Sequence, residues 1–249
     1  MFFKRKESLN KDFSFLGVDM HNHILPGIDD GAPDIHTSIQ LLSALKNMGF
    51  SEIIPTPHTY TSLYLNTPNT IGDAFDSLQI ALSMTLENYS LPVVKRFASE
   101  YMVDHHFSGI ITSNAPLSFG QNRVLIEMSF ADIAPMLMDE IFQLQLQGYI
   151  PVLAHPERYP YLLGNLEYFE HLVSIGCELQ LNLLSLTDHY GTGPQKMALK
   201  LLEKNMYSWA GTDTHHMGHI ELLQKLLNSK LFRKIQEYPF KNSELGTYT

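Results

Sequence analysis

Residue types that bind metal ions crowd one short stretch of the sequence, GVDMHNHILPGIDDGAPD at residues 17–34. Within a dozen residues it places two histidines and three aspartates: Asp19, His21, His23, Asp29 and Asp30. Side chains two apart on an extended strand point to the same face, so a His-x-His pair can bind one cation. Because these polar groups are costly to remove from water, the stretch is either a solvated loop or a site that holds a cation.

Later apolar runs are also followed by an imidazole or a carboxylate. The side chains at the ends of those runs are His58, Glu100, Glu127, His155, Asp213 and His215, with Asn182 at the end of one more. The whole set of candidate metal ligands is His21, His23, Asp30, His58, Glu100, Glu127, His155, Asp213 and His215. These ligands exceed the needs of one ion, and two or three ions that share bridging carboxylates fit better.

A scaffold that positions these side chains is visible in the alternation of short apolar runs with amphipathic stretches. The predicted strands cover residues 13–20, 51–56, 93–99, 123–129, 150–155, 177–183 and 206–212. The predicted helices cover about 34–49, about 70–88, 135–149, 166–176, 194–205 and about 219–234. Strands that alternate with helices predict an α/β fold with a parallel sheet.

Seven strand–helix repeats without a long linker favour a distorted, TIM-like (β/α)7 barrel, with a doubly wound open sheet as the alternative. Such a barrel places its chemistry at the carboxyl ends of the strands, where the candidate ligands lie. We expect a single domain over residues 1–249, with flexible ends at 1–12 and 238–249.

Composition argues against several classes of function. The formal net charge of −9 argues against a nucleic-acid partner, which would require a basic surface. The single cysteine, Cys177, excludes an intramolecular disulfide and favours a reducing compartment. The amino-terminal residues show no apolar signal-peptide core, and no run reaches the roughly 18 apolar residues of a membrane span. We therefore expect a cytoplasmic protein that does not span a membrane.

Five motifs occur in a fixed order between residues 17 and 215: DMHNHILPGIDDG, TPH, IEMS, AHPERY and GTDTH. Together they resemble the PHP (polymerase and histidinol phosphatase) superfamily. More narrowly, they are similar to the bacterial PHP-type tyrosine-protein phosphatases of capsule and exopolysaccharide operons, the CpsB/YwqE-like group. A lone His-x-His pair would be weak evidence, whereas five motifs in register are specific.

The resemblance implies a PHP-type barrel that holds three divalent ions, most often manganese, with iron or zinc as alternatives. It implies a first ion on His21, His23, Glu100 and Asp213, a second on Glu100, Glu127 and His155, and a third on Asp30, His58 and His215. Arg158, in AHPERY, would contact the substrate phosphate as a catalytic residue. Asp19 is expected to orient a histidine rather than to bind metal.

One segment departs from the family pattern. Members of the family carry an arginine several residues after the last Asp-x-His, whereas this chain reads DTHHMGHIELL from Asp213. Either His216 or His219 replaces that arginine, or the contact is missing.

The implied activity is phosphoester hydrolysis. Coordination lowers the pKa of water from about 15.7 to about 7, so hydroxide is available at neutral pH. The resemblance implies a phosphotyrosine protein as substrate, a bacterial tyrosine kinase of polysaccharide export. Two alternatives stay open: a small-molecule phosphatase such as a histidinol-phosphatase, and a non-catalytic metal-binding PHP module.

A cysteine-based phosphatase mechanism does not fit the sequence. It needs a C-x5-R loop, but Cys177 is followed six residues later by Leu183 and lies in a predicted strand. We therefore interpret Cys177 as a core residue. The remaining histidines are expected at the surface: His36, His105, His106, His171 and His189. Four tyrosines near the predicted rim either pack in the protein or flank an aromatic substrate: Tyr60, Tyr64, Tyr101 and Tyr159.

Overall fold

Every strand ladder in the computed structural model, which describes residues 11–85, 90–113 and 116–246, is parallel. The strands are β1 Val18–Asp19, β2 Glu52–Ile53, β3 His58–Thr59, β4 Glu100–Met102, β5 Arg123–Glu127, β6 Ile150–Ala154, β7 Glu178–Asn182 and β8 Trp209–Gly211. The α-helices are α1 Ile35–Asn47, α2 Pro68–Thr85, α3 Phe107–Ser113, α4 Leu137–Leu146, α5 Leu166–Ser174, α6 Thr192–Glu203, α7 Met217–Leu227, α8 Phe232–Gln236 and α9 Asn242–Leu245.

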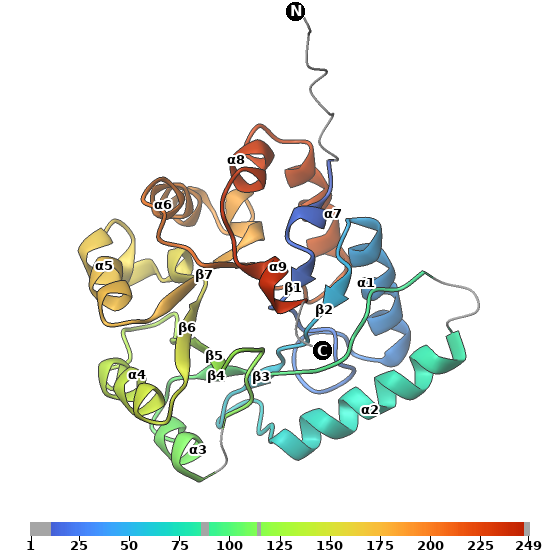
Figure 1. The fold of residues 1–249 in the computed structure, drawn as a ribbon, viewed down its shortest axis with the longest axis horizontal. Coiled ribbons are helices and arrows are strands. Elements are labelled where there is room, and N and C mark those ends of the chain that lie inside the picture. Colours follow the sequence, from blue (N-terminus) through green and yellow to red (C-terminus); the bar gives the residue numbers. More distant parts are fainter. Residues whose placement is uncertain (1–10, 86–89, 114–115, 247–249) are drawn as a thin grey trace, which may run out of the picture.

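The strands form a curled sheet inside a ring of helices (Figure 1). One six-stranded sheet runs in the order β3-β4-β5-β6-β7-β8, and β1 pairs with β2 in a separate ladder. Beyond the strand ends, His23 N donates to Thr214 O at 3.0 Å and Asp213 N donates to His21 O at 2.7 Å. The α/β class and the parallel sheet are confirmed. The sheet itself is a curled half-barrel, and strand ladders within the described residues do not complete a seven-stranded barrel.

Two prolines explain why the second predicted strand, 51–56, is shorter than expected and is followed by the separate strand β3. Pro55 and Pro57 have no N–H to donate, so a ladder cannot run continuously from β2 to β3. Their carbonyls still accept hydrogen bonds, from Ala98 N to Pro55 O at 2.8 Å and from Glu100 N to Pro57 O at 3.0 Å. The third strand was predicted at 93–99, but regular pairing begins only at Glu100, in β4.

The first predicted strand, 13–20, is mostly wrong. Residues Phe13–Phe15 form a 3-10 helix whose N-cap is Asp12, and only Val18–Asp19 pair as a strand. The Phe13 ring stacks on Phe50 at 5.5 Å and is completely buried. An apolar run thus marks burial correctly, but burial alone does not select an extended backbone.

Most later elements agree with the sequence prediction to within a few residues. The expected last helix, 219–234, is two helices, α7 and α8, because the chain turns at Asn228–Ser229 and Ser229 Oγ accepts from Leu231 N at 3.2 Å. Helix α3 was not predicted at all. The end of the expected helix 70–88 lies outside the described residues, as do most of the amino-terminal 1–12.

The carboxyl-terminal segment, predicted as a flexible end from 238, is instead packed against the sheet up to Gly246. Helix α9 lies across β1 (Figure 1), with Asn242 and Leu245 fully buried. The Asn242 amide accepts from Ala210 N at 3.0 Å and donates to Val18 O at 2.9 Å. This side chain therefore bridges β1 and β8, two strands that have no ladder between them.

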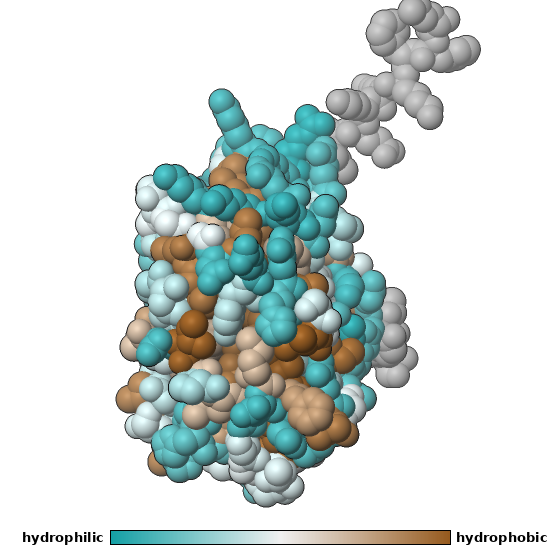
Figure 2. All heavy atoms as spheres, turned by 90° about the vertical axis from the view of Figure 1, so that its left-hand side faces the viewer, coloured by the Kyte–Doolittle hydropathy of each residue, from teal (hydrophilic) through white to brown (hydrophobic). Residues whose placement is uncertain are grey.

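Two apolar clusters fill the space on either side of the strands. The larger one lies between the sheet and the helices. The smaller one is Val18, Met20, Ile54, Ala98, Phe119, Leu125, Val152, Ala154, Trp209 and Leu245. Outside, the face that carries α4, α5 and α6 mixes apolar and polar side chains (Figure 2), with Phe142 and Leu146 of α4 among the exposed apolar residues.

A cluster of polar and charged side chains lies at the amino ends of β5, β7 and β8. We call Arg123, Glu178, Trp209 and Lys241 the amino-end cluster. Glu178 accepts from Arg123 Nε at 2.7 Å, from Trp209 Nε1 at 2.7 Å and from Lys241 Nζ at 2.8 Å. Burial opposes its charge, but these three donors lower the pKa of Glu178 to about 2.

Candidate metal centre

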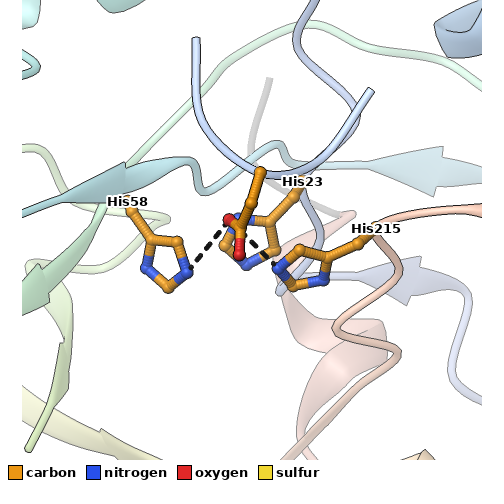
Figure 3. Close-up of side chains that lie close together, drawn as sticks. His23, His58 and His215 are labelled. Atoms are coloured by element: carbon orange, nitrogen blue, oxygen red, sulfur yellow. Dashed lines mark ion pairs between the residues drawn. The ribbon is translucent and has the colours of Figure 1, made fainter. Parts of the chain in front are cut away.

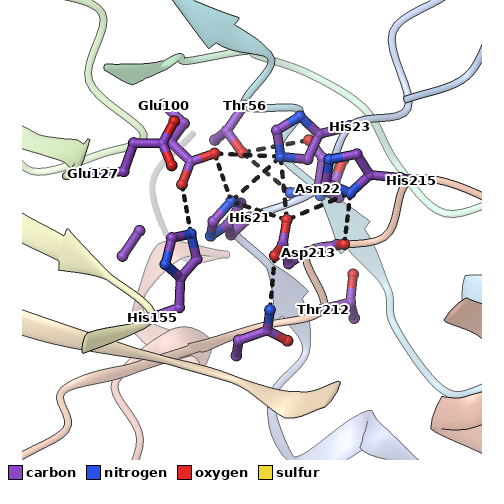
Figure 4. A network of polar contacts seen from close by, with 12 residues as sticks. His21, Asn22, His23, Thr56, Glu100, Glu127, His155, Thr212, Asp213 and His215 are labelled. Carbon is purple, nitrogen blue, oxygen red and sulfur yellow. Dashed lines mark hydrogen bonds and ion pairs between the residues drawn. The ribbon is translucent and has the colours of Figure 1, made fainter. Parts of the chain in front are cut away.

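All the predicted ligands come together at the carboxyl side of the strands. Figure 4 labels seven of them: His21, His23, Glu100, Glu127, His155, Asp213 and His215. Their positions are after β1 (His21, His23), at the start of β3 (His58) and β4 (Glu100), at the end of β5 (Glu127), after β6 (His155) and after β8 (Asp213, His215), with Asp30 in the loop before α1. In four overlapping groups the ligand atoms lie within 4.8 Å of one another: His23–Asp30–His58–His215, His21–His23–Asp213, His21–Glu100–His155 and His58–Glu100–Glu127. Parallel register explains part of this convergence, because His58 pairs with Glu100 and Met102 pairs with Glu127.

Glu100 is the carboxylate that the groups share. Its Oε1 lies 3.0 Å from His155 Nε2, and its Oε2 lies 3.1 Å from His21 Nε2. His58 Nδ1 at 3.2 Å and His23 Nε2 at 3.4 Å also face Oε2. Glu100 Oε2 and His58 Nδ1 are nevertheless buried without a partner in hydrogen-bond geometry. A buried polar atom without a hydrogen bond is costly. Ligand atoms that point at a shared cation would lie close to one another without forming hydrogen bonds among themselves, as these atoms do.

A second part of the site is more open (Figure 3). His58 Nε2 and His215 Nε2 each lie 3.6 Å from Asp30 Oδ1, and the Asp30 side chain is 53% exposed. The rings of His23 and His215 stack at 3.9 Å. This group therefore forms the solvent side of the centre, whereas Glu100 lies at its buried side.

The electrostatics of the centre match a cation site. Burial opposes the charge on Glu100, but His21 and His58 hold the pKa of that carboxyl well below its usual range. Burial likewise opposes ionisation of Asp213, whose pKa is held well below its usual range chiefly by His21. Burial would lower the pKa of His58, but Glu127 and Glu100 raise it to about 9. The carboxylates thus favour protonated imidazoles, and a bound cation would replace those protons.

Two of the predicted ligands have an unusual backbone conformation. His155 and Asp213 have φ angles of 35° and 51°, in the left-handed region that costs a residue with a side chain about 1 kcal/mol or more. Gly211, in β8, faces His21, and a Cβ on Gly211 would lie 2.5 Å from the His21 Cβ. A glycine is therefore required there for the His21 side chain to take its place.

Two residues that contact the histidines were given no role from the sequence, although Asp29 was noted in the first stretch. Gln180 Oε1 lies 2.9 Å from His21 Nδ1, and Asp29 Oδ2 lies 2.8 Å from His23 Nδ1. Asp29 Oδ2 also accepts from His58 N at 3.1 Å. Contacts of this kind fix the tautomer and orientation of a ligating imidazole. The position of Gln180, on the same face of β7 as Asn182, was the available signal, because residues two apart share a face.

Asp19 lies beneath the centre, and its hydrogen bonds go to backbone N–H groups and to the side chains of Thr212 and Asn22 rather than to an imidazole. Its carboxylate accepts from Thr212 N at 3.0 Å and from Thr212 Oγ1 at 2.6 Å. Its contact with His21 is to the backbone N–H, at 3.4 Å. Burial raises the pKa of Asp19 to about 6. Asp19 therefore ties the end of β1 to the end of β8.

Arg158 stands beside the centre with its side chain 18% exposed. Its Nη1 donates to Asp213 Oδ2 at 2.7 Å, and Asn182 Nδ2 donates to the same oxygen at 2.7 Å. The guanidinium lies over the ring of Tyr190 at 4.1 Å and over the ring of Phe130 at 4.8 Å. Arg158 is therefore held between two aromatic rings at the edge of the ligand cluster.

At the position of the missing family arginine, the two histidines differ. His219 is buried, and its Nδ1 accepts from His215 N at 3.3 Å. His216 is exposed, and its ring lies 4.0 Å from that of His219. Burial lowers the pKa of His219 to about 4, so this ring is neutral at neutral pH and does not supply the charge of an arginine.

The interpretation of Cys177 as a core residue is confirmed, since it is buried and burial raises the pKa of its thiol to about 12. Tyr101 and Tyr159 are also buried. Tyr64 differs, because its ring stacks on His58 at 5.5 Å, whereas Tyr60 pairs with Tyr64 through the backbone. The histidines expected at the surface are all exposed: His36, His105, His106, His171 and His189.

None of the helices in the described ranges is both long and apolar enough to cross a bilayer.

Comparisons with known proteins point in one direction. The model of the CpsB/CapC family of capsular polysaccharide synthesis matches residues 17–235. The chain is 33% identical to the tyrosine-protein phosphatase YwqE of Bacillus subtilis over 202 residues, which are 80% of this chain and 78% of YwqE. It is 22% identical to the tyrosine-protein phosphatase CpsB of Streptococcus agalactiae over 205 residues, 80% of this chain and 83% of CpsB.

A solved structure agrees. It comes from a study of YwqE from Bacillus subtilis and CpsB from Streptococcus pneumoniae, described there as unique metal-dependent tyrosine phosphatases. It superimposes on this chain with a TM-score of 0.74 at 31% identity, over 87% of this chain and 90% of that one.

Proposed function

Because this chain belongs to the CpsB/CapC family of capsular polysaccharide synthesis, we propose that it is a metal-dependent phosphoester hydrolase. Its substrate in this proposal is phosphotyrosine in a protein, and its role is the regulation of capsular or exopolysaccharide synthesis. The relatives with which it aligns over most of its length are named tyrosine-protein phosphatases.

One observation carries the proposal. Four imidazoles surround the buried carboxylate of Glu100 at 3.0 to 3.4 Å, while its Oε2 has no partner in hydrogen-bond geometry. Neutral imidazoles and carboxylates are the ligand set that manganese, iron and zinc share. A purely structural ion pair would instead place an arginine or lysine beside such a carboxylate.

We propose three divalent ions, manganese first, with iron or zinc as alternatives. The ligand sets are His21, His23, Glu100 and Asp213 for the first ion, Glu100, Glu127 and His155 for the second, and Asp30, His58 and His215 for the third. Such ions supply an activated water and positive charge for the phosphoryl oxygens. The overlapping groups of ligand atoms support sharing of Glu100 between two ions.

The residues of the chain itself bind and orient. Arg158 would bind the phosphate, since its guanidinium is positioned by two aromatic rings and by Asp213 at the edge of the cluster. A guanidinium offers two parallel donors to phosphate oxygens. Asp29 and Gln180 hold the imidazoles of His23 and His21 in place. The phenol of tyrosine has a pKa of about 10, so the leaving group needs little help from an acid.

The proposal extends to the partner, the location and the architecture. The phosphotyrosine protein is a bacterial tyrosine kinase of polysaccharide export. A cytoplasmic location is supported by the single, buried Cys177. Residues 1–249 form one PHP-type domain with the architecture of a distorted (β/α)7 barrel. In the described part of the chain no strand ladder joins β1 to β8, and the hydrogen bonds that join His21 and His23 to the segment after β8 support closure there.

Metal removal tests the proposal directly. Purified protein is analysed for its elements, stripped with a chelator and reloaded with single metals, and each form is given a phosphotyrosine peptide and histidinol phosphate. We expect turnover of the peptide to vanish on chelation and to return best with manganese. Preference for histidinol phosphate would contradict the assigned substrate. Absence of any hydrolysis in the reloaded protein would contradict the enzymatic function.

A further inference from the structure

An exposed phenylalanine stands next to the metal centre. Phe130 lies in the loop after β5, and its side chain is 42% exposed. Its ring stacks on the His155 ring at 5.8 Å and 26°. His155 in turn contacts Glu100, so Phe130 is separated from the shared carboxylate by a single imidazole. Single exposed apolar residues are common on protein surfaces, so exposure alone does not give Phe130 a function.

The loop that carries Phe130 is firmly held. The backbone N–H of Met128 donates to Tyr159 Oη at 3.0 Å, and Tyr161 Oη donates to the carbonyl of Ser129 at 2.6 Å. Tyr159 is completely buried, and its hydroxyl donates to Ala154 O at 3.1 Å. The exposure of Phe130 is therefore a fixed property of the loop and not the result of a loose segment.

Phe130 also borders the side chain that would bind the phosphate. The Arg158 guanidinium lies 4.8 Å from the centre of the Phe130 ring, and its Nη1 is bonded to Asp213. A phosphate bound by Arg158 would therefore lie next to an exposed aromatic ring.

We propose that Phe130 is a specificity-determining residue that packs against the phenyl ring of a phosphotyrosine substrate. The inference rests on the proposed function. Aromatic rings attract one another in offset or edge-to-face arrangements at 4.5 to 7 Å, beyond the effect of buried area alone. The alkyl chain of phosphoserine or of a small alkyl phosphate offers no such partner. Phe130 therefore selects aryl esters, while the centre itself binds the phosphoryl group of aryl and alkyl esters alike.

Binding of non-hydrolysable probes tests this without a contribution from leaving-group chemistry. The dissociation constants of phenylphosphonate and methylphosphonate are measured by calorimetry on manganese-loaded protein. We expect Phe130→Ala to weaken phenylphosphonate about five- to tenfold and methylphosphonate less than twofold. Phe130→Leu, which keeps an apolar side chain, should lie between wild type and Phe130→Ala.

The matched control is Phe142→Ala, which removes another exposed phenylalanine, 56% exposed, from α4. It should change neither constant. Equal weakening of both phosphonates by Phe130→Ala, no weakening of either, or the same effect from Phe142→Ala would overturn the inference. Wild-type turnover of a phosphotyrosine peptide is assayed in parallel. Failure there contradicts the proposed function, whereas normal turnover with a neutral Phe130→Ala contradicts only the inference.

Discussion

The two ends of the parallel strands both carry carboxylates, fully buried in Glu100 and partly buried in Glu178, but with opposite kinds of partner. In the amino-end cluster, Glu178 faces Arg123 and Lys241, cations that the chain supplies permanently. In the metal centre, Glu100 faces four imidazoles that are charged only when protonated. The first arrangement is complete within the chain. The second provides ligand atoms, and in the proposed function a cation completes it.

The comparison shows that burial of a carboxylate does not identify a functional site, whereas the type of its partner does. Arginine and lysine neutralise a carboxylate and occupy the space around it. Histidine contributes a lone pair and leaves that space for an ion. The only arginine bonded to a ligand carboxylate of the metal centre, among the described residues, is Arg158.

The largest expected effect is a difference in phosphatase activity between variants of the metal centre and of the amino-end cluster. Glu100→Gln removes the charge of the shared carboxylate, so we expect kcat/KM for p-nitrophenyl phosphate to fall about a thousandfold and the bound manganese to decrease. Activity assays and elemental analysis of the same preparation measure this. The control is Glu178→Gln, which should stay within about twofold of wild type. Similar losses in both variants would remove the distinction between the two ends.

Stability should respond in the opposite way. Glu178→Ala leaves Arg123 without its carboxylate partner at a site where the arginine side chain is 11% exposed, so we expect the free energy of unfolding to fall by about 3 kcal/mol. Urea unfolding of the chelated protein measures it. A loss below about 1 kcal/mol would show that the amino-end cluster contributes little to stability.

A residue that only orients a ligand should give an intermediate effect at the metal centre. Asp29→Asn weakens the hold on the His23 ring, so manganese affinity should fall about 10- to 100-fold. Calorimetric titration of the stripped protein with manganese is the measurement. Asp34→Asn, in the same loop but capping α1, is the matched control and should leave the affinity unchanged. Unchanged affinity in Asp29→Asn would place Asp29 outside the metal-binding machinery.

The smallest expected effect is a pH dependence of the amino-end cluster. The pKa of Glu178 is lowered from 4.5 to about 2, so its ionised form stabilises the fold above about pH 4.5. That contribution is lost as the pH falls through about 2. The difference in unfolding free energy between wild type and Glu178→Gln should therefore shrink between these values, as measured by urea unfolding at a series of pH values. A difference that stays constant over this range would contradict the assigned pKa.

The positions of the candidate ligands could be predicted because they follow a simple rule of parallel sheets. The sequence shows where apolar runs end, and parallel strands bring those ends to one side. His155 and Glu127 come from neighbouring strands, and the alternation of helix and strand was enough to place both on the same rim. No knowledge of distant contacts was needed for this step.

Other features depend on contacts that have no local signature. Gln180 lies 159 positions from His21, and Asn242 lies 224 positions from Val18, so neither pairing can be inferred from spacing. The segment after 238 is polar and short, which suggested a flexible end, but the amide of Asn242 fills a gap between two strands. Phe130 was overlooked because an exposed apolar residue in a loop has no pattern at all.

The bridge made by Asn242 has a consequence for folding during synthesis of the chain. The first strand leaves the ribosome early, but the side chain that links it to the last strand is synthesised more than two hundred residues later. Likewise, the hydrogen bond from Asp213 N to His21 O can form only after Asp213 has been synthesised. The proposed metal site therefore cannot be complete before the segment after β8, with Asp213 and His215, has been synthesised.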